Sequence, residues 1–262
     1  MNDDQTRTPD DAGAIGAAGL VLRPLTARSI VLSTLLGHHP PRLPARALVR
    51  VGELFGIAEG TVRVALSRMV AAGDLRQTDG SYALTARLLA RQARQDESRS
   101  ARTRSWSGDW EIAVVTTPER RPAAERTALR QAMATLRLAE LREGNWLRPA
   151  NLDRPRPAVV TDQCSWFTAT PDDDPAALAG RLWDLPGWAT RARALSAALD
   201  RPATHANRFT VAAAALRHLL ADPLLPAELL PESWPGGQLR HDYAEFETEL
   251  RELLRQYLSD TP

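Results

Sequence analysis

Apolar residues recur at helical spacing in three successive segments near the start of the chain. The segments are Ala27–His38, Ala45–Phe55 and Glu59–Ala72. Pro44 fits the start of the second segment, because proline is tolerated in the first turn of a helix. Gly73 follows the third segment, at the position where a glycine commonly ends a helix. The pattern therefore predicts three short helices.

Two short β-type runs follow the third helix. They are Leu75–Thr78 and Ser81–Leu84, with Asp79-Gly80 between them. Asp-Gly between two such runs is a strong signal for a tight hairpin. Three helices closed by a hairpin are the element order of a winged helix-turn-helix, so we expect this domain over residues 25–90.

Beyond this domain the pattern becomes polar and then changes to a mixture of strands and a helix. Residues 91–105 are rich in arginine and lack an apolar period, which predicts a linker. Residues 106–170 then carry a β-rich run, a helical segment and three further β-type runs: Trp110–Thr116, Pro122–Leu136, Ala139–Arg142, Asn145–Leu147 and Val159–Thr168. This order predicts a ferredoxin-like α+β domain.

The remainder of the chain, residues 171–262, has helical patterning only, and we expect an all-α C-terminal domain. The expected helices are Pro175–Trp183, Pro186–Leu199, His205–Leu220 and Gln238–Leu258. Residues 1–24 are acidic and then rich in glycine and alanine, which predicts a disordered tail. The expected fold class is thus α+β and multidomain.

The charge of the chain is unevenly distributed. Lys+Arg number 33 and Asp+Glu 32, a net charge of only +1, and every one of these cations is an arginine. Residues 21–95 carry 11 arginines against four acidic residues, a local net charge of +7. The predicted winged-helix domain is therefore basic, as a module that is attracted to nucleic acid needs to be.

The sequence carries few signals for export or for a membrane. One cysteine, Cys164, cannot form an internal disulfide. The N-terminus is acidic, where a signal peptide would be basic. The longest stretch without Asp, Glu or Arg is Ser29–Pro41, 13 residues, whereas roughly 18 or more are needed to cross a bilayer. We expect a cytoplasmic protein with no membrane partner.

The third predicted helix is the best candidate for a functional surface. At 100° per residue, Val62, Leu66 and Met69 fall on one arc and predict its buried face. The other arc is small, hydroxylated and basic, and can lie close in a major groove. Arg76 of the hairpin is placed to touch the DNA backbone. The predicted DNA-binding residues are Gly60, Thr61, Arg63, Val64, Ser67, Arg68 and Arg76.

Candidate chemistry elsewhere is sparse, and we expect neither an enzyme, nor a cofactor, nor a metal site. The first β-run of the middle domain ends Val114-Val115-Thr116 without a carboxylate, and the five histidines lack the spacing of a helical metal pair. Cys164 in a β-type run fits a buried small apolar residue. The seven tryptophans fit core packing, or else the walls of an effector cavity with Arg181, Arg191, Arg193 or Arg208 near a phosphate-bearing ligand.

Motifs in all three predicted domains resemble one bacterial family. The run Phe55-Gly56-Ile57-Ala58-Glu59-Gly60-Thr61-Val62-Arg63 and its continuation to Val70 resemble the recognition-helix region of the PaaX family, repressors of phenylacetic acid catabolism and their relatives. The other resembling motifs are Trp106-Ser107-Gly108-Asp109-Trp110, Arg142-Glu143-Gly144-Asn145-Trp146-Leu147-Arg148-Pro149 and the segment from Asp222-Pro223-Leu224 to Trp234-Pro235-Gly236. The resemblance covers residues from about 25 to 258.

The resemblance implies a homodimeric repressor with a Cas2-like ferredoxin fold in its middle domain. The best-known members release DNA on binding phenylacetyl-CoA, so an acyl-CoA thioester is a candidate effector. Ala58 departs from the family, which usually has a capping serine here, and the wing is reduced to an Asp-Gly turn. The expected partner is a two-fold double-stranded DNA operator. The alternatives are an enzyme with a winged-helix targeting arm and a winged helix that binds protein.

Overall fold

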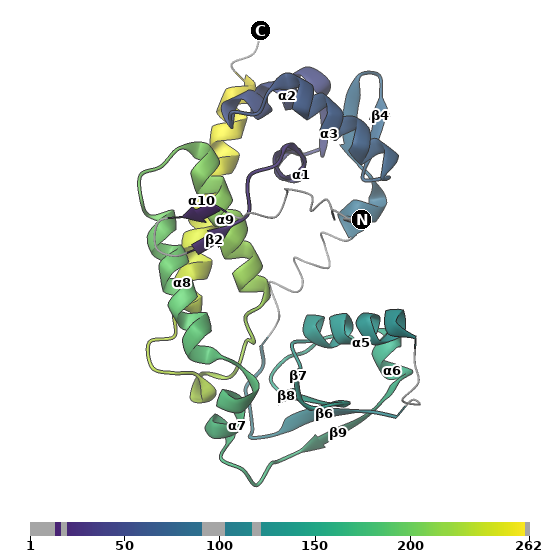
Figure 1. The fold of residues 1–262 in the computed structure, drawn as a ribbon, viewed down its shortest axis with the longest axis vertical. Helices are drawn as coiled ribbons and strands as arrows, with labels where there is room; N and C mark the ends of the chain where they lie inside the picture. Colours follow the sequence, from purple (N-terminus) through teal and green to yellow (C-terminus); the bar gives the residue numbers. More distant parts are fainter. Residues whose placement is uncertain (1–13, 17–19, 91–102, 117–121, 260–262) are drawn as a thin grey trace, which may run out of the picture. The chain divides into compact units, whose positions relative to one another are not determined.

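The computed structural model describes residues 14–16, 20–90, 103–116 and 122–259 (Figure 1). The chain divides into two compact units. The first comprises Met1–Arg91, Arg193–Leu216 and Gln238–Pro262, and the second Gln92–Ala192 and Arg217–Gly237. The division falls within three C-terminal helices, so the C-terminal segment contributes to both units. The sequence pattern did not predict this.

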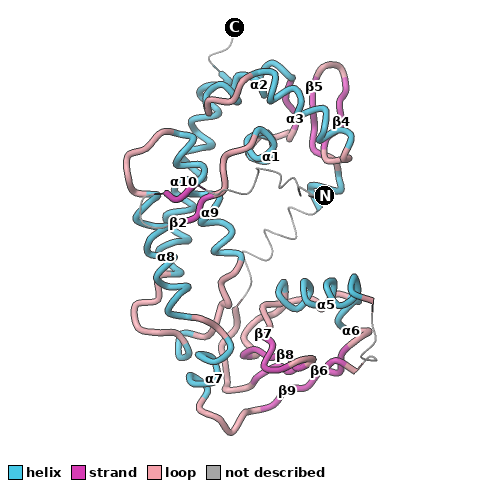
Figure 2. Tube along the Cα trace, viewed as in Figure 1, coloured by secondary structure: helices cyan, strands magenta, loops and turns pink. Residues whose placement is uncertain are grey.

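The first unit contains the expected winged helix (Figure 2). Its sheet has the order β3-β5-β4 with antiparallel pairs, and the Asp79-Gly80 turn joins β4 to β5. The elements are α1 (Ala27–Leu36), β3 (Arg42–Pro44), α2 (Ala45–Leu54), α3 (Glu59–Ala71), β4 (Leu75–Thr78) and β5 (Ser81–Leu84). Residues 86–90 form a further helical turn. Three helices and the hairpin are thus where the sequence predicts them.

Local chemistry explains where these helices begin and end. Thr26 and Ser29 form a reciprocal capping box at the start of α1, which satisfies amide groups that have no partner within the helix. Gly73, with φ of +70°, follows α3 in the left-handed conformation that favours glycine. Asp79 and Gly80 have φ values of 50° and 70°, as a two-residue type I′ hairpin turn requires.

The core of the winged helix is formed by apolar side chains from all three helices and from the sheet, among them Val31, Leu35, Leu48, Leu66 and Met69. Leu258 near the C-terminus of the chain packs against the same core. The last helix therefore belongs to the first unit.

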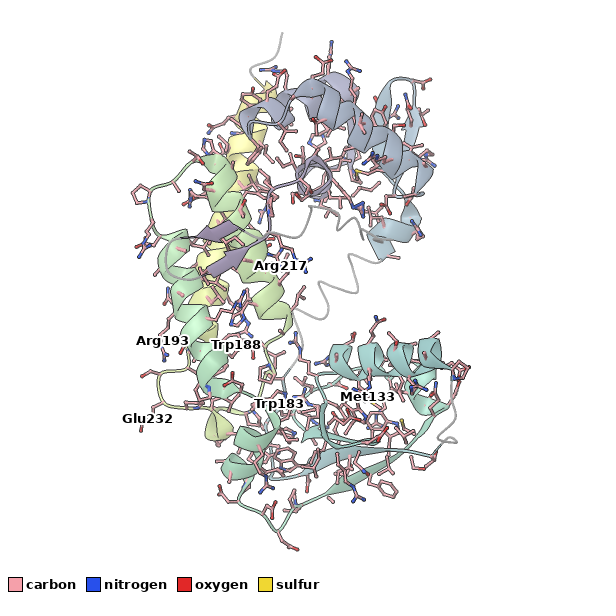
Figure 3. All side chains as sticks on the ribbon, in the orientation of Figure 1. Met133, Trp183, Trp188, Arg193, Arg217 and Glu232 are labelled. Atoms are coloured by element: carbon pink, nitrogen blue, oxygen red, sulfur yellow. The ribbon has the colours of Figure 1, made fainter. Side chains whose placement is uncertain are left out.

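The second unit contains a four-stranded antiparallel sheet of order β7-β8-β6-β9. The elements are β6 (Trp110–Val115), α5 (Ala123–Thr135), β7 (Ala139–Arg142), β8 (Asn145–Pro149), α6 (Ala158–Thr161) and β9 (Cys164–Ala169). This βαββαβ order confirms the predicted ferredoxin-like domain. Met133 of α5 is fully buried against the sheet in a core that includes Ala113, Trp146 and Cys164 (Figure 3).

The C-terminal segment is helical, as predicted. It contains α7 (Pro175–Leu182), α8 (Leu185–Leu199), α9 (His205–Leu220), the 3-10 turn η1 (Ala227–Leu229) and α10 (Gly236–Ser259). Within the described ranges, no helix combines the length and the apolar character that crossing a membrane requires.

The structure differs from the sequence-based expectation in several short segments. Within the predicted tail, β1 (Ala14–Gly16) and β2 (Leu20–Leu22) pair antiparallel. At the end of the predicted linker, Arg104 donates from its backbone amide to the carbonyl of Asn151 at 2.8 Å. Residues 91–102 of that linker lie outside the described residues. Strand β3 was not expected, because prolines surround it.

Candidate nucleic-acid interface

Helix α3 has two contrasting faces. Val62, Leu66 and Met69 are buried in the winged-helix core. Val64 keeps 51% of its surface exposed, more than a large apolar side chain packed inside a protein retains. The six predicted contact residues of this helix are all exposed: Gly60, Thr61, Arg63, Val64, Ser67 and Arg68. The structure therefore brings them onto one solvent-facing surface, and their contact with DNA stays a prediction.

The start of α3 has no side-chain cap. Ala58 is the capping residue, and only its backbone carbonyl is used, accepting from the amides of Thr61 and Val62 at 3.0 and 3.2 Å. A Cβ atom added at Gly60 would meet no atom within 4 Å, so the fold has room for a larger residue there. Glycine inside a helix lowers stability by about 0.5–1 kcal/mol relative to alanine. Packing within the chain does not explain Gly60, whereas close approach by a partner's backbone would.

Arg63 is oriented by a carboxylate of its own helix. Its Nε atom lies 2.7 Å from Oε1 of Glu59, four residues earlier, and both side chains are more than half exposed. An exposed pair of this kind contributes only about 0.3–0.5 kcal/mol to stability. Arg63 is thus held in place on the surface without being buried.

The wing presents a second basic position beside α3. Arg76 lies on β4, opposite Ala83 of β5, and its side chain is exposed. Arg42 of β3 also contacts the hairpin, because its Nη2 donates to the carbonyl of Thr78 at 3.3 Å. The type I′ turn and this hydrogen bond stabilise the strand that carries Arg76.

Two other arginines of the winged helix, Arg28 and Arg87, form ion pairs within the fold. Asp74 is buried just after α3, and its two carboxylate oxygens accept from Arg28 at 2.7 Å and from Arg87 at 3.1 Å. Arg87 also donates to the carbonyl of Ala72 at the C-terminal end of α3. These two arginines connect α1 and the segment after the wing to the C-terminal end of α3. Sequence reasoning treated these two charges as part of the electrostatic attraction to DNA and missed this role.

Arg68 and Arg76 differ from these arginines. Within the part of the chain that the structure describes, neither guanidinium has an ion pair or a hydrogen bond. A forked guanidinium without an internal partner can bond phosphate oxygens or the O6 and N7 atoms of guanine. Arg68 and Arg76 are therefore the two predicted site residues whose cationic donors are most fully available.

The tryptophans in the C-terminal segment pack against other rings. Trp188 lies between His218 and Trp234, with centroid distances of 4.4 and 4.5 Å, and Trp183 stacks on Trp110 at 6.5 Å. Trp183 and Trp188 are labelled in Figure 3. Burial lowers the pKa of His218, while its hydrogen bond to the Trp188 carbonyl acts in the opposite direction. These contacts support the interpretation that these rings serve core packing.

Two of the four arginines considered for an effector site are already paired with carboxylates. Arg181 contacts Asp173, and Arg208 contacts Glu249 at 2.7 Å. Cys164 packs in the core of the ferredoxin-like domain, as expected. Among the described residues, no group of three or more His, Cys, Asp or Glu side chains is arranged to hold a metal ion.

Three sequence-family matches cover the chain in order. Residues 26–88 match the family described as PaaX-like protein, residues 103–164 match the PaaX protein central Cas2-like domain, and residues 187–260 match the PaaX-like protein C-terminal domain. This chain belongs to the PaaX-like family. Members of the PaaX-like family are typically transcriptional regulators and generally not enzymes.

A solved structure is similar to this PaaX-like chain over most of its length. The uncharacterized protein Rv0674 from Mycobacterium tuberculosis is 47% identical, with a TM-score of 0.80, and the match covers 89% of this chain and 99% of that one. No curated protein matches the chain. All seven predicted contact residues lie within residues 26–88, the part that matches the N-terminal PaaX-like domain.

Proposed function

We propose that this PaaX-like protein is a sequence-specific DNA-binding transcriptional repressor that a small effector releases from its operator. The observation that carries the proposal is the exposed face of α3 together with the wing, where Arg68 and Arg76 have no partner among the described residues. A basic winged helix with such a face is suited to a major groove. Membership of a family of regulators supports the same function.

The chemistry of the α3 face suits both parts of DNA recognition. Thr61 and the bare backbone at Gly60 allow close approach to phosphates, which fixes the orientation of the helix. Ser67 and Arg68 offer donors to base edges, and Val64 offers an apolar contact for a thymine methyl group. Arg76 reaches backbone from the wing. Sequence discrimination would thus come from a short stretch of α3.

A homodimer on a two-fold operator follows from the small size of this contact surface. One recognition helix reads only a few base pairs, and two copies related by a two-fold axis double the contacts and fix the spacing of the half-sites. We therefore include a dimer and a palindromic operator in the proposal. The candidate effector is an acyl-CoA thioester.

The test measures DNA binding by fluorescence anisotropy. The full chain is titrated onto a labelled duplex from the region upstream of its own gene and onto a scrambled duplex of the same composition. The double variant Arg68→Ala/Arg76→Ala should bind the upstream duplex about 100-fold more weakly, because each lost base or phosphate contact is worth about 1–3 kcal/mol.

The matched control is Arg142→Ala/Arg201→Ala, which removes the same charge from exposed positions outside the winged helix. It should leave binding unchanged. Equal binding by the wild-type chain and the α3–wing variant would refute the interface. Affinity for duplex that does not fall as salt concentration rises would instead favour a winged helix that binds protein, because phosphate contacts release counterions.

A further inference from the structure

The first unit contains a large cavity beside helix α2. Its volume is about 770 Å³, within the range that accommodates small-molecule ligands. The walls come from the end of α1, from β3 and α2, and from the C-terminal half of α10. Leu43 and Leu254 in these walls are buried, and Ala47 and Leu258 are half-buried. The cavity thus has an apolar floor.

The rim of this cavity is strongly basic. Arg46 and Arg50 lie one turn apart on α2, and Arg251 and Arg255 lie one turn apart on α10. One carboxylate, Glu252, faces these four cations among the lining residues. It accepts from Arg255 at 2.9 and 2.7 Å, and these hydrogen bonds lower its pKa to about 2. Glu252 is therefore ionised and offsets mainly Arg255.

The other rim arginines differ in how firmly they are held. Arg50 lies over the ring of Tyr257, with its guanidinium carbon 4.9 Å from the ring centre. Arg46 and Arg251 are exposed and make no hydrogen bond or ion pair within the described ranges. They stand on opposite walls, one on α2 and one on α10. An anion between them would gain charge-assisted hydrogen bonds from both sides.

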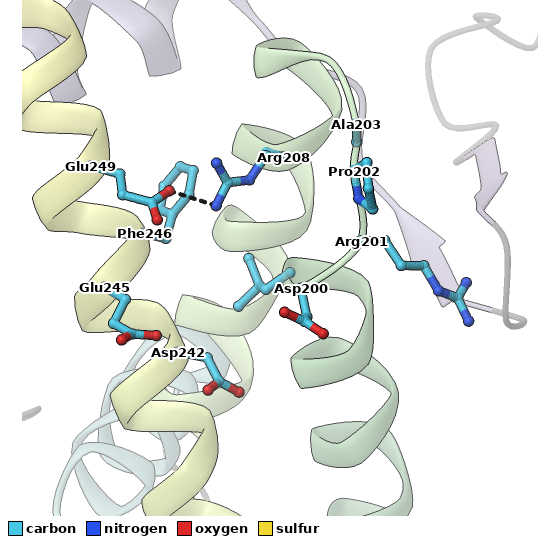
Figure 4. A pocket seen from close by; sticks show the side chains of 10 residues that line it. Asp200, Arg201, Pro202, Ala203, Arg208, Asp242, Glu245, Phe246 and Glu249 are labelled. Atoms are coloured by element: carbon cyan, nitrogen blue, oxygen red, sulfur yellow. Dashed lines mark ion pairs between the residues drawn. The ribbon is translucent and has the colours of Figure 1, made fainter.

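A second cavity of the same unit has the opposite charge. Its volume is about 430 Å³, and it is lined by the carboxylates of Asp200, Asp242, Glu245 and Glu249 against Arg201 and Arg208 (Figure 4). Arg208 is paired with Glu249 at 2.7 Å. An anionic ligand would be repelled there. The comparison within one unit identifies the arginine-rimmed cavity as the place where an anion with an apolar body would be bound.

We propose that the arginine-rimmed cavity is the effector site and that its ligand is an amphiphilic anion. The apolar body of the ligand lies on Leu43 and Leu254, and its carboxylate or phosphate group lies between Arg46 and Arg251. The inference rests on the proposed function, because it assigns the site that regulates DNA release. It also narrows the effector to a carboxylate or to a phosphate-bearing thioester of one.

The position of the cavity gives the ligand a route to the recognition helix. Helix α2 forms one wall, and its Gly52 lies so close to α3 that a side-chain carbon there would sit 2.4 Å from Cγ2 of Val62. Helices α2 and α3 are therefore in close contact at Gly52 and Val62. A ligand that displaces α2 must therefore move α3 as well, because tightly packed helices shift together.

The test uses the full chain and isothermal titration calorimetry. The probes are octanoate, octanoyl-CoA and octyltrimethylammonium, which share an apolar tail and differ in the head group, and each acid is repeated with butanoyl and decanoyl chains. We expect at least one class of anion to bind and the cation not to bind. Binding by thioesters alone assigns a phosphate head group, and binding by the free acids assigns a carboxylate. Failure of every anion, or equal binding of the cation, overturns the proposal.

Charge reversals locate the site. Arg46→Glu and Arg251→Glu should each weaken anion binding about tenfold, because each introduces a like charge at the rim. Arg201→Glu, which lines the acidic cavity, is the control and should have no effect. Unchanged affinity in both rim variants overturns the proposal, as does loss of the dimer in Arg251→Glu, which would indicate that a second copy covers the cavity.

The DNA measurement separates this proposal from the proposed function. The ligand that binds should lower operator affinity about tenfold, and operator DNA should lower ligand affinity by the same factor, since coupling between two sites is reciprocal. A chain that binds operator but no anion refutes the effector site alone. A chain that binds an anion but not DNA refutes the proposed function alone.

Discussion

Arginine serves opposite purposes in the two units. In the winged helix, Arg68 and Arg76 are exposed and have no internal partner among the described residues. In the ferredoxin-like domain, Arg148 on β8 is fully buried, with 0% of its side chain exposed. Its guanidinium donates to backbone carbonyls of Leu136, Pro149, Pro223 and Leu224, among others, and to Oδ1 of Asn151 at 2.8 Å.

The difference shows how burial and hydrogen bonding decide what an arginine does. Burial, and then the neighbouring Arg154, lower the pKa of Arg148 to about 9, while Glu111 at 3.6 Å acts in the opposite direction. The carbonyl oxygens around it satisfy its donors and keep the charge inside the domain. Arg137 likewise donates to the carbonyls of Leu220 and Asp222. These arginines fasten the segment around Asp222 within their unit, whereas Arg68 and Arg76 are left for a partner.

The largest expected effect comes from removing the buried charge. Arg148→Leu leaves several buried carbonyls and Oδ1 of Asn151 without their donor, so it should lower the free energy of unfolding by about 3–5 kcal/mol. Arg68→Leu, at an exposed position, should stay within about 0.5 kcal/mol of the wild type. Similar losses for the two variants would remove the distinction between the two kinds of arginine.

Tryptophan fluorescence during urea unfolding is the appropriate measurement for Arg148→Leu. All seven tryptophans lie in the second unit, so the signal reports on the unit that holds Arg148. Far-ultraviolet circular dichroism follows both units together. Arg142 on β7, the strand beside β8, provides a control. Its side chain is exposed, so Arg142→Leu makes the same substitution in the same sheet without removing a buried donor.

For the candidate nucleic-acid interface, the sequence predicted the helices and strands better than it predicted which arginines are paired within the fold. Helix α3 follows from the spacing of Val62, Leu66 and Met69, and the wing follows from Asp79-Gly80, because both signals are local. The roles of Arg28 and Arg87 depend on Asp74, which is 46 residues from the first and 13 from the second. No local pattern contains such a relation.

Arg148 illustrates the same limit in the second unit. The motifs ending at Arg148-Pro149 and beginning at Asp222-Pro223-Leu224 were recognised separately, and the structure shows that they meet: Arg148 of the first bonds the carbonyls of Pro223 and Leu224. Strand β3 was missed because prolines surround it. The predicted β-type run Val159–Thr168 was wrong at its start, where Ala158–Thr161 form the short helix α6 and the strand begins only at Cys164. The arginine-rimmed cavity was missed because its walls come from α2 and α10, at opposite ends of the chain.

A smaller change should sharpen the comparison at α3. Glu59→Gln removes the carboxylate that holds Arg63 and leaves Arg63 as available as Arg68. Loss of one negative charge beside the DNA, together with release of Arg63, should raise affinity for the operator roughly threefold at low salt. Helix stability should fall by only about 0.5 kcal/mol. Anisotropy titrations at two salt concentrations measure this effect, and weaker binding by Glu59→Gln would show that the ion pair itself presents Arg63 to DNA.

The smallest expected effect comes from protonation of His218, which adds a charge among the packed rings of the second unit. Because burial lowers the pKa of His218 below its ordinary value of 6.5, the folded protein takes up this proton less readily than the unfolded chain. The stability of the second unit should therefore be complete above pH 6.5 and fall as the pH decreases from there. Since His218 stacks on Trp188, its titration should appear in the pH dependence of tryptophan fluorescence with a midpoint below 6.5, and His218→Gln should abolish that transition. A midpoint above 6.5 would mean that a positive charge is favoured in this packed region and would contradict the prediction.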